Sequence, residues 1–281
     1  MLWLVLMLAL LVIGAVGGFF GSQVGLGGAV IVVPLITLFL GVPIAYAAGA
    51  SLIAAIATSS GAASAYVKDR VTNIRIGMSL EVGTTLGAII GAVVAVFIYK
   101  SGLASVIFIT FGAVLMASVV LELRKRANGR TAAKPDRTTR LFQLSGSYYD
   151  MAYKKRVRYN GVRWWLGEVA MFFAGAVSGL LGIGSGALKV LALDSAMKLP
   201  TKVSTSTSNF MIGVTAAVGS AIYWRFGYIQ PFIAGSIAVG VFAGAYLGSR
   251  VFMKERDSRI RMIFLVIVAL LAVEMILKGI A

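Results

Sequence analysis

Long apolar segments recur along the chain, and they limit its fold more than any other feature. The first runs from Leu2 to Leu40 without a charged residue, and several others reach the roughly 20 residues that a helix needs to cross a bilayer. Hydrophobic residues make up 59% of the 281 positions and charged residues only 13%, whereas soluble domains carry about 25% charged residues. The sequence therefore predicts an all-α integral membrane protein that crosses the bilayer many times.

Missing residue types exclude several kinds of chemistry. The chain has no cysteine, which excludes disulfides and thiolate metal sites, and no histidine, which is the commonest general base and metal ligand. The sequence also offers no nucleophile paired with a base. We therefore expect neither an enzyme nor a protein that holds a cofactor or a metal. The opening residues, MLWLVLMLALLVIG, lack a basic region, so a cleaved signal peptide is not expected.

The positive charge of the chain is concentrated in its middle. The formal net charge is +16, and residues 123 to 163 hold twelve Lys or Arg but only two acids, Asp136 and Asp150. Cytoplasmic loops of membrane proteins carry such an excess of Lys and Arg. We interpret 123–162 as a basic cytoplasmic loop, with an anionic partner of that loop as the alternative. Binding of nucleic acid is not expected.

This loop divides the chain into two membrane halves, 1–122 and 163–281. Each half contains five apolar segments. In the first half they are residues 2–21, 26–41, 43–67, 75–99 and 103–122, and in the second half they are residues 163–181, 186–198, 201–224, 230–252 and 260–280. The chain is thus predicted to have about ten membrane segments.

The two halves repeat one pattern. A single offset of 157 residues, with no gap, aligns Gly18 with Gly175, Gly25 with Gly182, Gly27 with Gly184, Pro43 with Pro200, Ser51 with Ser208, Thr58 with Thr215 and Tyr66 with Tyr223. A repeat of five segments enters the membrane on one side and leaves on the other, so the second copy is predicted to be inverted. With the basic loop inside, both termini face outward. Inverted repeats with interrupted helices are a recurrent plan of secondary transporters.

Glycine-rich stretches break both halves at the same place. They read GSQVGLGGA at 21–29 and SGLLGIGSGA at 178–187. Each precedes a short segment, 29–40 or 187–198, and twelve residues rise only about 18 Å, against a hydrocarbon core of about 30 Å. The short helices are therefore predicted to begin near the midplane, where helix N-termini attract anions and glycine lets backbone approach a ligand. The residues expected to line this site are Gly25, Gly27, Gly28, Gly182, Gly184, Ser185 and Gly186.

Glycines in membrane helices also serve close packing, as in the GxxxG pattern. That interpretation fits the evenly spaced glycines better than it fits the two loops, which are denser than packing requires. The glycines assigned to packing are Gly14, Gly18, Gly83, Gly87, Gly91, Gly240, Gly244 and Gly248.

Several polar residues fall inside the apolar segments, where they are costly and often functional. Lys189 follows the second glycine stretch and is expected to face a bound anion, unless it pairs with Asp194 or Glu168. Hydroxyl and amide groups could donate to the same anion or bond between helices, and these are Ser51, Thr205, Thr207, Ser208 and Asn209. The embedded acids Glu81, Glu168 and Glu274 either relay protons or pair with a base. Tyr66 and Tyr223 are predicted to be interfacial anchors.

These motifs carry a resemblance to a known family. The pattern GxxxGxxGxGG…P, repeated as SGLLGIGSGALKV and followed by TSTSNFMIGVTAAVGSAIY, resembles the TauE/SafE family of sulfite and organosulfonate exporters. The chain departs from the usual glycine triplet at Ala29 and Ser185, and it has Leu191 where the first copy has Pro34. The stretch LSGSYYDMAYKKRVRYNGV resembles the loop insert of one branch of the family. We interpret that insert, 142–162, as a small cytoplasmic β-hairpin.

The resemblance implies a function. Members of the family are implied to move small sulfur-containing anions across the bacterial inner membrane. We therefore expect a secondary transporter that exports an anion such as sulfite or an organosulfonate. An anion channel and a non-transporting membrane accessory protein of sulfur metabolism are the alternatives. The expected partners are the small anion, the lipid bilayer and, in a homo-oligomer, further copies of the chain.

Overall fold

The computed structural model describes residues 2–25, 27–124, 133–151, 154–254 and 258–280. The side chains of residues 2, 124, 253–254 and 258–261 lie outside this description as well. The basic residues at 125, 126 and 130 of the 123–162 loop thus lie outside the described residues.

Five helices make up the first half of the chain. They are α1 (Leu2–Val24), α2 (Ala29–Phe39), α3 (Ile44–Lys68), α4 (Ile74–Lys100) and α5 (Ala104–Arg124). Pro43 directly precedes α3, and its fixed φ suits a helix start. The side chain of Asn73 caps α4 by accepting a hydrogen bond from the Ile76 amide at 3.0 Å.

The second half repeats this order after a short connecting unit. That unit contains α6 (Arg137–Leu141), β1 (Ser145–Asp150) and β2 (Lys155–Asn160), and the following helices are α7 (Trp164–Leu181), α8 (Gly186–Leu191), η1 (Ala192–Ala196), α9 (Thr201–Arg225), α10 (Pro231–Lys254) and α11 (Ser258–Ile280). The π-helix η1 continues α8 directly, so the two form one short helical segment over 186–196.

Seven described helices are long and apolar enough to span a membrane: α1, α3, α4, α5, α7, α10 and α11. Three of the ten predicted segments therefore do not qualify as apolar spans. Helix α2 contains only 11 residues. The α8–η1 segment contains 6 residues in α8 and 5 in η1. Helix α9 has 25 residues, but the polar run STSTSN at 204–209 makes it less apolar than a typical span.

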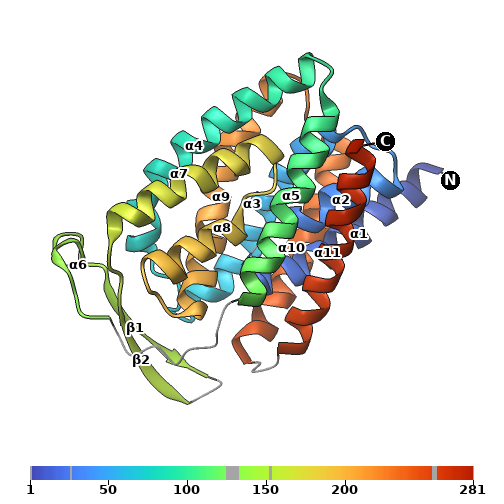
Figure 1. Cartoon of the computed structure of the whole chain (residues 1–281). Coiled ribbons are helices and arrows are strands. Elements are labelled where there is room, and N and C mark those ends of the chain that lie inside the picture. Colours follow the sequence, from blue (N-terminus) through green and yellow to red (C-terminus); the bar gives the residue numbers. More distant parts are fainter. Residues whose placement is uncertain (1, 26, 125–132, 152–153, 255–257, 281) are drawn as a thin grey trace.

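Six of the described long helices pack in two groups, each of which contains helices from both halves of the chain. Helix α1 packs along α10, which also packs along α3, and α4 packs along both α7 and α9. Contacts between α3 and α9 join the groups, and α5 packs along α11. In Figure 1, α4 and α7 lie side by side at the left, and α5 and α11 lie together nearer the right.

Evenly spaced glycines allow the closest of these approaches, as predicted for packing. A Cβ atom at Gly87 of α4 would collide with the Phe172 carbonyl oxygen of α7. A Cβ atom at Gly244 of α10 would collide with the Ala15 carbonyl oxygen of α1. Glycine is therefore required at both contacts because the partner backbone occupies the space that a side chain needs.

The predicted β-hairpin is confirmed within residues 142–162. Strands β1 and β2 pair antiparallel, with Ser145 opposite Asn160 and Asp150 opposite Lys155. In Figure 1 the hairpin lies at the lower left, whereas the start of α1 and the end of α11 lie at the upper right. The hairpin and the two ends of the helical region are thus at opposite ends of the molecule.

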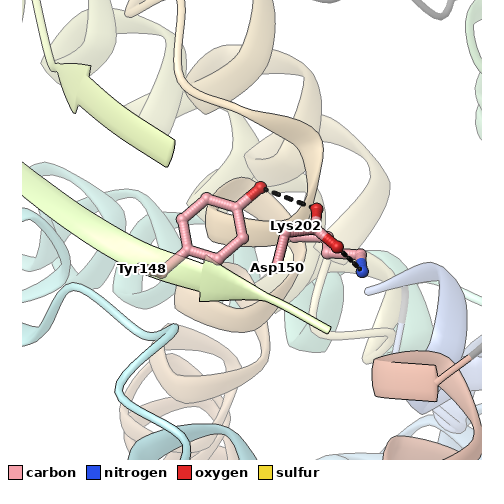
Figure 2. Close-up of polar contacts among 3 residues, drawn as sticks. All are labelled: Tyr148, Asp150 and Lys202. Atoms are coloured by element: carbon pink, nitrogen blue, oxygen red, sulfur yellow. Dashed lines mark hydrogen bonds and ion pairs between the residues drawn. The ribbon is translucent and has the colours of Figure 1, made fainter. Parts of the chain in front are cut away.

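Polar contacts join the hairpin to the helices. The Lys202 ammonium of α9 donates to Asp150 Oδ1 at 2.9 Å, and the Tyr148 hydroxyl lies 3.4 Å from Asp150 Oδ2 (Figure 2). The Asn73 amide group before α4 donates to the Tyr159 hydroxyl at 3.0 Å. These contacts hold the hairpin against the first residues of α4 and α9.

A capping box fixes the segment that leads into the hairpin. Asp136 Oδ1 accepts from the Thr139 amide, and its Oδ2 accepts from the Arg163 amide, both at 2.7 Å. Desolvation would raise the pKa of the Asp136 carboxyl, but the hydrogen bonds from Arg163 and Thr139 outweigh it and hold that pKa below its usual range. The ionised carboxylate thereby ties α6 to the start of α7.

Candidate functional site

Two serines at matching positions of the two halves bond the glycine loops to the long helices α3 and α9. The Ser51 hydroxyl of α3 donates to the carbonyl oxygen of Gly182 in the second loop. The Ser208 hydroxyl of α9 lies 3.2 Å from the carbonyl oxygen of Gly25 in the first loop and 3.3 Å from that of Gly186. Each long helix therefore binds the glycine loop of the opposite half.

The backbone conformation of both loops requires glycine. Gly27 and Gly184 have φ values of +78° and +70°, which side chains of L-residues rarely adopt. An added Cβ at Gly184 would lie 2.9 Å from Ile212 Cγ2, and one at Gly27 would lie 3.5 Å from Ile212 Cδ1. The two loops thus approach the same side chain of α9, and Ile212 is a contact that the sequence did not single out.

Ser185 departs from the glycine pattern and adopts a strained conformation. Its φ of +43° is in the left-handed region, which costs free energy for a residue with a side chain. Its hydroxyl oxygen is buried and has no hydrogen-bond partner among the described residues. An unpartnered buried donor next to the start of α8 is available to a ligand oxygen.

The start of the short helix α2 is already partly bonded within the protein. The Gly28 amide donates to the Thr58 hydroxyl oxygen of α3 at 3.1 Å. One N–H group at this helix start is therefore occupied in the described conformation. Thr58, which the sequence comparison aligned with Thr215, thus caps the first glycine loop.

Lys189 is fully buried in α8 and bonds to a hydroxyl group of α9. Its ammonium donates to the Thr215 hydroxyl oxygen of α9 at 2.6 Å. The Thr215 oxygen lies in turn 2.6 Å from Glu81 Oε1 of α4. The candidate partners were Asp194 and Glu168; Glu168 Oε1 instead accepts from the Gly83 amide at 2.7 Å.

The polar run of α9 divides between the loops and other contacts. Thr205 lies against Gly25, since a Cβ added to that glycine would be 3.0 Å from Thr205 Cγ2. The Asn209 amide donates to the Ser22 carbonyl at 2.9 Å, and its Oδ1 is buried with no partner in the described part of the chain. The Thr207 hydroxyl oxygen instead accepts a hydrogen bond from the backbone N–H of Asn73 at 3.1 Å. Thr207 therefore faces the turn before α4.

The prediction that Tyr66 and Tyr223 are interfacial anchors is wrong. Both side chains are fully buried. The Tyr66 hydroxyl donates to the Ser22 carbonyl at 3.0 Å, and the Tyr223 hydroxyl donates to the Gly179 carbonyl at 3.1 Å. A buried tyrosine needs such a partner, and here the partner is the last turn of the helix that precedes each glycine loop.

An open cavity lies at the end of α2 away from its glycine loop. It has a volume of about 380 Å³ and is bordered by the loop after α2, the end of α4, the start of α5 and α11. Thr37, Tyr99, Tyr228 and Lys278 contribute its polar groups. The Lys278 ammonium donates to the Thr37 carbonyl at 3.0 Å. The cavity therefore has a positively charged group on its lining, at the end of the molecule opposite the hairpin.

The seven apolar spans are those of a multi-pass membrane protein, and the family and relatives that the chain matches are transporters, not enzymes. The family model described as "Sulfite exporter TauE/SafE" matches residues 10–275. The chain belongs to the TauE/SafE family.

Curated relatives resemble the chain over nearly its whole length. It is 30% identical to "Probable membrane transporter protein YunE" of Bacillus subtilis, over 96% of this chain and 97% of that protein. It is 25% identical to "Probable membrane transporter protein YdhB" of the same organism, over 88% of this chain and 89% of the relative. It is 24% identical to "Probable membrane transporter protein MJ0441" of Methanocaldococcus jannaschii, over 98% and 97%. No solved structure gives a significant match.

Proposed function

We propose that the chain is a secondary transporter that exports a small sulfur-containing anion, such as sulfite or an organosulfonate, across the bacterial inner membrane. The observation that carries this proposal is the meeting of the two glycine loops, with Ser51 and Ser208 bonded across to the opposite loop. The fully buried cation Lys189 lies beside the second loop. The family description, which names sulfite export, supports the choice of substrate.

The substrate site of this proposal lies between α3, α9 and the two loops. It includes Gly25, Gly27, Gly28, Ser51, Gly182, Gly184, Ser185, Gly186, Lys189, Thr205, Ser208 and Asn209. Backbone amides, hydroxyl groups and one ammonium would surround the anion, which is the donor set that oxyanions require. Thr207 was also a candidate, but its contact with Asn73 makes it a support for the turn before α4.

The proposal includes an inverted relation between residues 1–122 and 163–281. Equivalent contacts at several positions 157 residues apart support the repeat, and its odd number of five segments is the reason to propose inversion. Tyr66 and Tyr223 bind the carbonyls of Ser22 and Gly179, and α3 and α9 have the same length, 25 residues. Alternating access would then exchange the roles of the two halves around the loops.

This arrangement gives a testable topology. We expect a reporter fused at Gly146, in β1, to be cytoplasmic and one fused after Ala281 to be periplasmic, because the basic segments then lie inside. Paired alkaline phosphatase and fluorescent protein fusions measure both positions. Reporters that place Gly146 and the C-terminus on the same side of the membrane would contradict the inverted arrangement.

Flux through the purified protein tests the function. Reconstituted into liposomes, the protein should take up labelled sulfite or a sulfonate with a saturable rate, and unlabelled anion inside should accelerate uptake by counterflow. Protein-free liposomes and an unrelated membrane protein serve as controls. An anion channel would conduct without saturation or counterflow, and an accessory protein would move no anion; either result contradicts the proposal.

A further inference from the structure

The chain of contacts from Lys189 to Glu81 connects three helices inside the membrane region. The Lys189 ammonium of α8 and the Glu81 carboxylate of α4 both contact the Thr215 hydroxyl oxygen of α9, each at 2.6 Å. Lys189 is fully buried and Glu81 is 7% exposed. A cation and an acid thus lie on either side of one hydroxyl group in the protein interior.

The Glu81 carboxylate has an oxygen atom that is free to bind a proton. Oε2 of Glu81 is buried and makes no hydrogen bond of ordinary geometry among the described residues, although the Thr85 hydroxyl approaches the carboxyl from the same helix. The titratable groups that face Glu81 are Lys189 from α8 and Glu168 from α7. Helix α9 contributes the uncharged Thr215.

The other half of the chain has no charges at the matching positions. The residues found 157 positions away in the other half are Val32, Ala238 and Leu11, in place of Lys189, Glu81 and Glu168. Thr58, the counterpart of Thr215, caps the Gly28 amide instead. Since a buried ion pair is often no more stabilising than apolar side chains of similar size, stability alone gives no reason for the charges.

We propose that Glu81 is the proton-binding residue of the transport cycle and that one proton binds there when an anion binds at Lys189. This inference rests on the proposed function. In the empty site the Lys189 ammonium and the Glu81 carboxylate, counted as a pair, neutralise each other. A monovalent anion beside Lys189 would leave one uncompensated negative charge in a region where isolated charge is very costly. A proton added from water to Oε2 of Glu81 restores neutrality and breaks no other bond.

The sign of the pH effect follows from this balance. Because the anion-bound state holds one more proton, anion binding strengthens as the pH falls, by up to about tenfold per pH unit for one proton. Methanesulfonate is the suitable probe, since its own charge stays constant over the useful pH range. Sulfite itself changes charge near neutral pH and would obscure the result.

Proton counting on the wild-type protein is the first test. Methanesulfonate added to purified protein in weakly buffered solution with an indicator dye should cause uptake of protons that saturates together with binding. The Glu81→Gln variant, which imitates the protonated carboxyl, should bind with no proton uptake and with an affinity that does not change with pH. Glu274→Gln is the matched control, because Glu274 borders the groove between α2 and α11, and it should keep the pH dependence.

Thr215 provides a second pair of variants if Glu81→Gln fails to fold. Thr215→Ser keeps the hydroxyl group and should preserve proton uptake, whereas Thr215→Val has a similar shape without the hydroxyl and should reduce it. Counterflow of methanesulfonate by the wild type establishes separately that the protein transports. Wild-type counterflow without proton uptake on binding, or unchanged pH dependence in Glu81→Gln, would overturn the assignment of Glu81 while leaving the transport function intact.

Discussion

Gly184→Val should abolish anion transport, and Gly27→Val should do the same, while both variants remain folded in the membrane. Both glycines have positive φ, a conformation that costs a residue with a side chain about 1–2 kcal/mol. Valine adds a branched Cβ that at Gly184 begins 2.9 Å from Ile212. The loop must therefore shift, and with it the carbonyl and amide groups proposed to surround the anion. Counterflow in liposomes measures the loss.

The control is Gly235→Val in α10. This residue is also a membrane glycine, but an added Cβ there meets no described atom within 4 Å. Its transport should stay near the wild-type rate apart from a small loss of helix propensity. Size-exclusion profiles in detergent check that all variants fold. Normal transport by both Gly27→Val and Gly184→Val would make the loops packing elements and move the substrate site elsewhere.

Lys189→Ala should weaken anion binding by about 1–3 kcal/mol, the loss expected for a charged hydrogen-bond partner, which corresponds to about 5- to 150-fold in Kd. Lys189→Arg should restore only part of the affinity, because a planar guanidinium differs in shape from an ammonium. Calorimetry with methanesulfonate measures all three proteins. Lys100→Ala is the control, since Lys100 is exposed and lies over the Phe226 ring at the end opposite the hairpin.

A double variant separates binding from folding. Removal of Lys189 alone leaves the buried Glu81 carboxylate without its cation, which destabilises the protein. Glu81→Gln in the same chain removes that unpaired charge, so the double variant should regain stability but not anion affinity. Wild-type affinity in Lys189→Ala would make Lys189 a structural partner of Thr215 and Glu81, and the loops alone would then account for anion selectivity.

The sequence predicted most of the helical elements because their signals are local. The interruption before α2 follows from the glycine density at 21–28, and the short segment 186–196 follows from its position between Gly182–Gly186 and Pro200. The aligned serines Ser51 and Ser208 also proved to make equivalent contacts with the two loops. The constant offset of 157 residues predicts that these serines are equivalent, and that prediction does not require the packing of the helices to be known.

Contacts between distant segments could not be predicted in the same way. Glu81 was recognised as an embedded acid, but its link to Lys189 depends on how α4, α8 and α9 lie together. Tyr66 was interpreted as an anchor because tyrosines near segment ends often face the headgroups. Its burial follows from the close contact of α3 with the end of α1, which a pattern within one segment does not contain. Thr215 was noticed only as the counterpart of Thr58.

The attachment of the hairpin has a mechanical consequence. Its hydrogen bonds reach Asn73 before α4, Lys202 in α9 and, through Val162, the Met197 carbonyl that precedes α9. Those elements all belong to the group formed by α4, α7 and α9. The hairpin is therefore mechanically coupled to that group. A molecule bound to the hairpin would apply torque to α4, α7 and α9, and movement of these three helices would in turn move the hairpin.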